Sequence, residues 1–247
     1  MKRFIRPTTL LAFLGALLLP AALPVDPVPT FSDPTHITNP WSPFVPGAVK
    51  LFRGKLEGQP TAMLETHLKD TRSFDWQGQP ITTSMLEERE FEHGQLVEIA
   101  VTYLAQDDAG NVWCFGEVSL IVEDGVVVGD EVDSWLVGGP QAGDPADVKA
   151  ATDPMLFMLA NPEVGDTFEQ QPAPGAAETL TVIATNLTVK LPGGTFTGVV
   201  RVQEVDDGED GADATSSRWL APGVGVIKDK EHHGHTLLIG SEIAATK

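Results

Sequence analysis

The stretch that decides the fold is 97–103, Val-Glu-Ile-Ala-Val-Thr-Tyr, in which apolar side chains occupy every second position. A period of two is typical of a half-buried β-strand. The following run 107–111, Asp-Asp-Ala-Gly-Asn, contains residue types that tolerate a positive φ and therefore predicts a turn. A second apolar run covers 112–122, and Asp124-Gly125 is a two-residue hairpin signal between apolar segments. Strands joined by such short turns are antiparallel neighbours, so the centre of the chain predicts a β-meander.

The same pattern extends in both directions from this centre. His93-Gly94 predicts the preceding turn, and although 85–91 also fits a helical face, a strand must lie there for the hairpin to form. Earlier strands are expected near 49–51 and around Met63, Phe74 and Trp76, and one short helix is expected over 146–151. Later strands are predicted at 168–170, 179–189, 195–205, 216–220, 224–228 and 236–243. The fold class is therefore all-β: an antiparallel meander that forms a large curved sheet, half-barrel or barrel, with at most short helices.

Composition restricts the partners of the protein. The chain has 247 residues, of which 42% are hydrophobic, and this is enough to build a substantial core. It carries 16 Lys and Arg against 35 Asp and Glu, a formal charge of −19. Such an acidic chain repels phosphate backbones and anionic lipid headgroups, so we expect no nucleic-acid partner and no peripheral-membrane role. The single Cys114 excludes an intrachain disulfide and a cysteine-based metal cage, and we expect it to be a small buried side chain.

The first 22 residues have the three-part build of a secretory signal peptide. Three cations precede an apolar run at 10–19, which ends in Pro-Ala-Ala. The run is about half of the roughly 20 residues that a membrane span needs, although an uncleaved anchor is the alternative. We therefore expect a secreted or periplasmic protein with no stable membrane insertion after cleavage. Residues 23–36 predict a proline-rich flexible leader, and 37–247 a single β domain.

Three motifs resemble a family of secreted bacterial all-β proteins that has no established activity. They are Asn-Pro-Trp-Ser-Pro-Phe-Val-Pro-Gly at 39–47, Ala-Gln-Asp-Asp-Ala-Gly-Asn-Val-Trp-Cys-Phe-Gly-Glu at 105–117, and Trp-Leu-Ala-Pro-Gly-Val-Gly-Val at 219–226. The chain departs from the family pattern at Tyr103-Leu104, where the family has Trp-Tyr, and at Cys114, where it has Tyr. The resemblance covers about 37–230 and implies a β fold and export, without an activity, cofactor or catalytic residue.

Two groups of residues have the chemistry of metal ligands. His233 and His235 would share one face of a strand and could bind zinc or copper, although their surroundings also suit an exposed turn. Asp107, Asp108 and Asn111 offer the oxygen ligands that calcium prefers, as does the acidic run 206–213, but turn and loop chemistry explains both. Calcium is thus a possible cofactor that we do not expect to be bound.

Three aromatic residues of the central hairpin, Tyr103, Trp113 and Phe115, are the candidates for stacking on a ligand, although a sheet core would contain the same residue types. No Gly-x-Ser-x-Gly, His-Glu-x-x-His or phosphate-loop motif is present in the sequence. Two carboxylates such as Glu117 and Asp133 could meet across strands as an acid–base pair, although a chain with 35 acids always offers some such pair.

These observations favour a secreted, non-catalytic protein that binds a small or extended ligand, or a surface component, in the concavity of its sheet. One alternative is a secreted hydrolase that uses carboxylates or a His-bound metal, and another is an extracellular metal-binding protein. A deep apolar cavity with few titratable groups would support the first hypothesis. Convergent carboxylates with a histidine would support the hydrolase.

Overall fold

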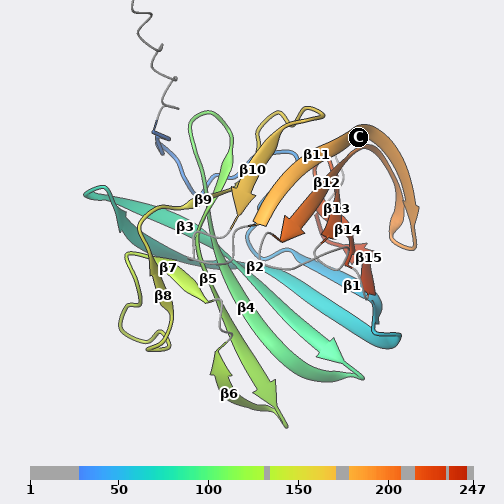
Figure 1. Cartoon of the computed structure of the whole chain (residues 1–247), viewed down its shortest axis with the longest axis horizontal. Helices are drawn as coiled ribbons and strands as arrows, with labels where there is room; N and C mark the ends of the chain where they lie inside the picture. The colour runs from blue at the N-terminus through green and yellow to red at the C-terminus, as the bar shows by residue number, and fades with distance from the viewer. Residues whose placement is uncertain (1–27, 131–133, 171–177, 207–214, 232–233, 244–247) are drawn as a thin grey trace, which may run out of the picture.

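The computed structural model describes residues 28–130, 134–170, 178–206, 215–231 and 234–243, and these residues contain strands and no helix (Figure 1). The strands join into one sheet of 15 members in the order β10-β11-β12-β13-β14-β15-β1-β2-β3-β4-β5-β7-β8, with β6 and β9 paired to β5. All pairs are antiparallel except that of β7 with β8. The prediction of an all-β meander is confirmed, and the sheet is curved without closing into a barrel. The predicted signal peptide at 1–22 lies outside the described residues.

The strands have the following bounds: β1 Val49–Leu56, β2 Gln59–Trp76, β3 Gln79–Glu92, β4 Gln95–Gln106, β5 Val112–Glu123, β6 Val126–Asp130, β7 Trp135–Val137, β8 Lys149–Ala151, β9 Met155–Met158, β10 Thr167–Gln170, β11 Glu178–Leu191, β12 Gly194–Asp206, β13 Thr215–Ala221, β14 Gly225–Lys230 and β15 Gly234–Ser241.

Tight turns set the register of the long central hairpins. At the predicted turn His93-Gly94 the φ angles are 51° and 81°, and at Asp124-Gly125 they are 51° and 78°. Two successive left-handed residues give the backbone twist that a two-residue hairpin needs, and glycine adopts it without strain. The segment 85–91 is a strand, as predicted, because it pairs on one side with β2 and on the other with β4.

The short helix expected over 146–151 is absent, and this prediction was wrong. Residues 149–151 instead form β8, which runs parallel to β7. Val148 and Ala151 are buried in the large core beside this pair. A helix of six residues is too short to be stable by itself, whereas pairing with β7 satisfies the backbone of this segment.

The coiling of the sheet creates its concave inner face. β13 and β3 are separated by four strands in the sheet order, yet side chains from both line one cavity. The large core contains an aromatic cluster in which Phe115 packs against Phe31, Phe74 and Trp76. A smaller core gathers around Phe52, Trp219 and Leu238.

Residues 30–47 form an extended segment that docks on the sheet, which we name the N-terminal strap. Its first part is held by Asp108, whose carboxylate accepts hydrogen bonds from the Thr30 hydroxyl and from the backbone N–H and hydroxyl of Ser32. Phe31 lies edge-on against Trp76, with 6.0 Å between the ring centroids. The structure describes 28–36 of the leader predicted for 23–36, and there side chains far along the chain supply hydrogen-bond partners for the strap.

The second part of the strap is fixed by two side-chain amides. The Gln106 Oε1 atom accepts the backbone N–H groups of Thr38 and Asn39, both at 2.8 Å. The Asn39 Nδ2 atom in turn donates to the carbonyl oxygens of Gly110 and Leu159. These bonds bring the proline-punctuated motif 39–47 to the edge of the concave face.

Candidate functional site

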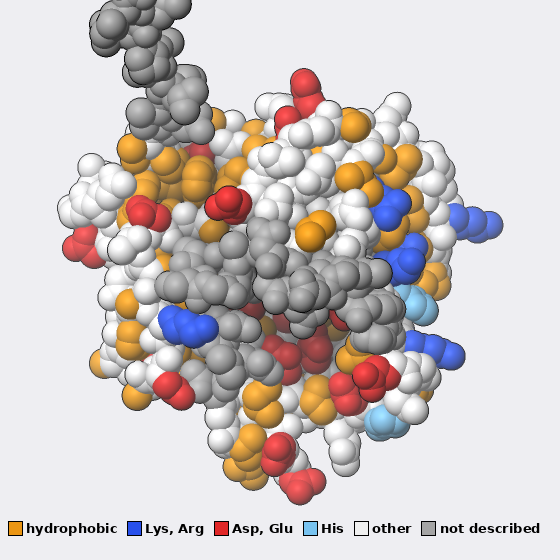
Figure 2. Space-filling view, viewed as in Figure 1, with side chains coloured by type: hydrophobic (Ala, Val, Ile, Leu, Met, Phe, Trp, Pro, Cys, Tyr) orange, Lys and Arg blue, Asp and Glu red, His pale blue; other side chains and the backbone are white. Residues whose placement is uncertain are grey.

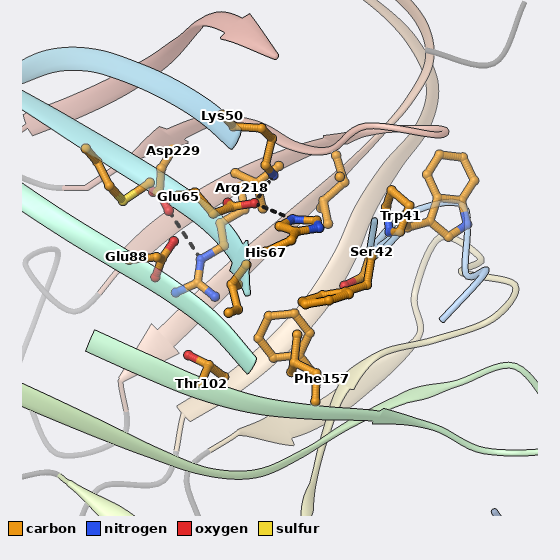
Figure 3. A pocket seen from close by; sticks show the side chains of 18 of the residues that line it. Trp41, Ser42, Lys50, Glu65, His67, Glu88, Thr102, Phe157, Arg218 and Asp229 are labelled. Carbon is orange, nitrogen blue, oxygen red and sulfur yellow. Dashed lines mark hydrogen bonds and ion pairs between the residues drawn. The ribbon is translucent and has the colours of Figure 1, made fainter. Parts of the chain in front are cut away.

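A cavity of about 290 Å³ lies between the inner face of the sheet and the N-terminal strap (Figure 3). One part of its wall is apolar and comprises Trp41, Phe44, Leu86, Leu104, Phe157, Leu220 and Val226. Another part is acidic and comprises Glu65, Glu88, Glu90, Glu117, Asp229 and Glu231, and the cations Lys50 and Arg218 also line the cavity. Figure 2 shows acidic side chains gathered in a hollow near the middle of the face it presents. A smaller pocket of about 80 Å³ shares Met63, Glu90, Asp229, Glu231 and Thr236 with the cavity and continues it outward.

The alternation of strands β2 and β3 produces the acidic wall. Leu86, Glu88 and Glu90 point to the same face of β3, since they are two residues apart. The register places Glu88 directly opposite Glu65 on β2 and places Glu90 opposite Glu98 on β4. Like charges facing each other across strands are unfavourable when both are ionised. The arrangement is therefore costly unless protons or cations compensate it.

At the inner end of the cavity, Lys50, Glu65 and His67 form a buried polar cluster, with 4%, 4% and 2% of their surfaces exposed. The Lys50 Nζ atom lies 2.6 Å from the Glu65 Oε1 atom. The His67 Nδ1 atom accepts the backbone N–H of Val45 at 2.9 Å, so in the neutral ring the proton is on Nε2 and donates to Glu65 at 3.0 Å. Burial raises the pKa of Glu65, but Lys50 and His67 outweigh it and hold that pKa below its ordinary value.

Phe44 completes this cluster from the strap. Its ring stacks on the His67 imidazole, with 4.4 Å between centroids and 15° between planes. Both ring nitrogens of His67 are thus bonded and one of its faces is covered. The cluster fixes the strap over the cavity and leaves His67 without a free nitrogen for proton transfer.

Glu88 on the acidic wall differs from Glu65 in having no described partner for its carboxyl. Among the described residues its carboxyl has no hydrogen bond or ion pair. Burial first, and then the charges of Glu65, Glu117 and Glu90, raise the pKa of Glu88 to about 8. Its carboxyl is therefore largely protonated at neutral pH.

The mouth of the cavity is also acidic. Desolvation and then the neighbouring carboxylates, Glu98 foremost, raise the pKa of Glu90 to about 7, although Glu90 keeps access to solvent. Glu117 accepts a hydrogen bond from the Thr102 hydroxyl at 3.0 Å, and burial still raises its pKa. Glu88 and Glu90 on β3 and Glu117 on β5 therefore all bind a proton more tightly than a free glutamate does.

The opposite wall contains one arginine shared by two acids. Arg218 on β13 lies 3.0 Å from Glu204 on β12 and 3.2 Å from Asp229 on β14. The other carboxylate oxygen of Asp229, Oδ1, is buried and has no hydrogen-bond partner. Burial raises the pKa of Asp229 despite the guanidinium. The six acids of the lining thus face Lys50 and Arg218, which are both already paired with acids.

The three predicted ligand-stacking residues lie elsewhere, since none of them lines this cavity. Phe115 is 0% exposed and Tyr103 is 6% exposed, and both belong to the large core. The Tyr103 hydroxyl accepts a hydrogen bond from Arg72, which also pairs with Asp144. Trp113 is half-buried and donates its ring N–H to Asp107 at 2.8 Å.

The oxygen ligands predicted for calcium, Asp107, Asp108 and Asn111, are hydrogen-bonded to other protein groups. Asp107 accepts the backbone N–H and side-chain amide of Asn111, and the Asn111 Oδ1 atom accepts the N–H of Ala160. Asp108 holds the strap, and its hydrogen bonds lower its pKa. His235 is exposed on β15, and His233 lies outside the described residues. The described ranges contain no group of three or more His, Cys, Asp or Glu side chains arranged to hold a metal ion.

Three further sequence candidates can be placed. Cys114 is fully buried, and burial followed by the charge of Glu117 raises the pKa of its thiol far above the ordinary value. It therefore stays a neutral thiol. Asp133, the suggested partner of Glu117, and most of the acidic run 206–213 lie outside the described residues.

Sequence reasoning missed Lys50, Glu65, His67 and Glu88. The available signal was the alternation of 86–91, in which both sets of every-second residues contain glutamate, so that one set had to face the interior. An acidic residue on the inner face of a strand is unusual, and this would have marked the concavity as charged.

Comparison with known proteins adds no relative: no family model, curated protein or solved structure matches the chain. Within the described part of the chain, nothing forms a helix long and apolar enough to cross a bilayer. The interpretation of the site therefore depends on its own geometry.

Proposed function

We propose that this chain is a secreted, non-catalytic binding protein that holds a small organic amine in the cavity. The ammonium group would lie against Glu88, Glu90 and Asp229, and the carbon skeleton against the apolar wall near Phe44 and Phe157. Export is the part of this proposal that comes from the predicted signal peptide. Ligand sites that combine an apolar wall with a few convergent polar groups are the usual form of small-molecule pockets.

The observation that carries the proposal is the excess of carboxyls over cations in the lining of the cavity. A ligand cation would compensate the repulsion between neighbouring acids and could use the buried, unpartnered oxygen of Asp229. An anionic ligand would meet the same acids and be repelled. A bare metal ion is less well matched, since the described residues contain no ligand set for one.

Matched probes that differ only in charge test this proposal. We expect hexylamine to raise the melting temperature and to bind in calorimetry, while hexanol and hexanoate bind at least tenfold more weakly. Equal binding of hexanol or hexanoate would refute a site for cations, and no binding by any probe, including phenethylamine, would refute an amine-binding cavity.

Two tryptophan variants of strand β2 locate the bound probe. Met63 lines the cavity, so Met63→Trp should fill it and abolish hexylamine binding. Leu64 is the next residue, is similarly half-buried and points to the other face, so Leu64→Trp should bind normally. Loss of binding in both variants, or in neither, would contradict the assignment.

A second candidate function is favoured by the raised carboxyl pKa values. Glu88 is a protonated acid at neutral pH, and convergent carboxyls with a histidine are what we expected of the hydrolase alternative. His67 is excluded as the base by its two hydrogen bonds, so that only the carboxyls remain for such chemistry. Turnover of p-nitrophenyl glycosides or esters that is lost in Glu88→Gln would favour the hydrolase over the binding protein.

A further inference from the structure

The outer face of strands β12 to β15 and β1 differs in charge from the rest of this acidic chain. One row of directly opposite residues crosses the five strands through Arg201, Trp219, Lys228, Leu237 and Arg53. The neighbouring row contains Gln203, Ser217, Lys230, His235 and Lys55. These ten positions hold five Lys and Arg residues and no acid. We name the five cations, Arg53, Lys55, Arg201, Lys228 and Lys230, the basic face.

Side-chain contacts place the two rows on one face of the sheet, where Trp219 and Ser217 are themselves buried, with 9% and 4% of their surfaces exposed, beneath the flanking cations. The Trp219 ring lies between two cations, with the Arg201 guanidinium carbon 4.8 Å and the Lys228 Nζ atom 4.1 Å from its centroid. Arg201 also donates to the Ser217 hydroxyl in the neighbouring row. Such packing restricts both long side chains and orders the centre of the face.

Described acids lie near one edge of this face, where Lys55 and His235 line the smaller pocket together with Glu90 and Glu231. None of the five cations forms an ion pair with a described residue. Desolvation and then the charges of Lys230 and Arg201 lower the pKa of Lys228, which indicates mutual repulsion. Asp229, Arg218 and Glu204 of the same strands point to the inner cavity instead. Most Lys and Arg side chains visible in Figure 2 gather along its right-hand edge, where these strands lie in Figure 1.

We propose that the basic face binds a linear polyanion, a flexible chain with phosphate or sulfate groups at regular short intervals. Neighbouring strands are about 4.8 Å apart and alternate residues of a strand about 6.8 Å apart, so the two rows form a band about 19 Å long and two side chains wide. A narrow charged chain fits this band. It can bridge the cations on both sides of Trp219 and relieve their repulsion.

The acidity of the remaining surface favours a linear polyanion over an anionic membrane as the partner of the basic face. Screening limits charge effects to about 8 Å at physiological ionic strength. A narrow polymer on the band therefore responds mainly to the basic face. A flat anionic bilayer would also approach the acidic surroundings of a chain with net charge −19 and be repelled. The net negative charge disfavours anionic partners in general, and the basic face is a local exception to it.

Inorganic polyphosphate of about 20 units is the probe for this proposal. We expect the intact chain to bind it in a salt-dependent manner, measured by fluorescence anisotropy of the labelled polymer between 50 and 200 mM salt. The variant Lys55→Gln/Lys230→Gln removes two exposed cations of the face. We expect it to bind about tenfold more weakly and to lower the slope of log affinity against log salt by about 1 to 2.

The matched control is Lys69→Gln/Arg89→Gln, which removes two exposed cations elsewhere. It should bind polyphosphate within twofold of the unmodified chain, and melting curves should show that both double variants fold. Equal loss in the two variants, or no binding by the unmodified chain, would overturn the proposal. So would binding to vesicles of phosphatidylglycerol and phosphatidylcholine that is as strong as binding to polyphosphate. Lys55 also lines the smaller pocket beside the cavity, so the two sites are distinguished with Lys230→Gln alone, which lines neither pocket and should leave hexylamine binding unchanged.

Discussion

Glu65 and Glu88 are directly opposite each other on neighbouring strands of the same cavity, yet their pKa values move in opposite directions. Glu65 is fully partnered by Lys50 and His67, and it remains ionised. Glu88 lacks a described partner and holds a proton up to a pH of about 8. Burial alone thus does not determine the state of a carboxyl. The partnered cluster holds the strap, whereas Glu88, which has no described partner, is the carboxyl that the proposed amine would contact.

The largest expected change in stability tests the partnered side of this comparison and comes from Lys50→Met. Removing the cation leaves the Glu65 carboxylate buried without its main partner, which costs about 3–5 kcal/mol of unfolding free energy. Urea denaturation at pH 7 measures the loss. Adding Glu65→Gln should restore part of it, and Lys55→Met, an exposed change on the same strand, should leave stability almost unchanged. A loss below about 1 kcal/mol would show that the cluster is not structural.

Glu88→Gln is expected to change the pH dependence of stability. The raised pKa of Glu88 means that the folded state keeps its proton while the unfolded chain releases it near pH 4.5, so stability falls as pH rises toward about 8. The slope from this group approaches about 1.4 kcal/mol per pH unit. The variant should lose that slope and gain about 3 kcal/mol at pH 7.

Denaturation curves between pH 5 and 9 measure this change. Glu87→Gln is the control, because Glu87 is on the other face of β3 and pairs with Arg89. An unchanged slope in Glu88→Gln would show that the carboxyl is ionised, contrary to the comparison with Glu65. Glu65 contributes in the opposite sense: because its pKa is lowered, its contribution is present above its unfolded pKa and is lost as pH falls.

A smaller effect is expected from His67→Phe, which keeps the stacking with Phe44 but removes two hydrogen bonds. The backbone N–H of Val45 loses its acceptor, so we expect a loss of about 1–2 kcal/mol. Hydrogen exchange at Val45 should become faster, since the strap is released from the cluster. His93→Phe, at an exposed histidine that contacts Gln59, should not change that exchange rate. Normal protection of Val45 in His67→Phe would contradict the role of His67 as an anchor.

The smallest effect is expected from Asp108→Asn, at a carboxylate that is partnered but exposed. One oxygen remains to accept a hydrogen bond from the strap, so the melting temperature should be almost unchanged. Millimolar calcium should also not raise it, since protein donors already occupy the carboxylate. A calcium-dependent rise that disappears in the variant would identify this turn as a cation site instead.

The fold could be predicted in outline because hairpins depend on local chemistry. Alternation at 97–103 and the turns at His93-Gly94 and Asp124-Gly125 depend on neighbouring residues alone. The strap could not be predicted in this way, since its anchors, Gln106 and Asp108, are supplied from far along the chain. A proline-rich segment without periodicity gives no local sign of such partners.

The site was harder to predict than the fold because it depends on register. Residues 86–91 contain glutamate on both faces, and only pairing with β2 shows that Glu88 faces inward opposite Glu65. Aromatic residues such as Phe115 were the natural candidates for a ligand, but the same side chains fill the core. Sequence alone therefore indicated a concave sheet and could not show that its inner surface is acidic.

The position of the strap at the start of the described chain has a consequence for folding. As the chain is made, the strap precedes its partners: Gln106 follows Asn39 by 67 residues, and Asp108 follows Thr30 by 78. Closing loops of this length delays docking until β4 and its turn have formed. We therefore expect the sheet to curve first and the strap to cover it last, so that the cavity is most widely open to the solvent during the final stage of folding.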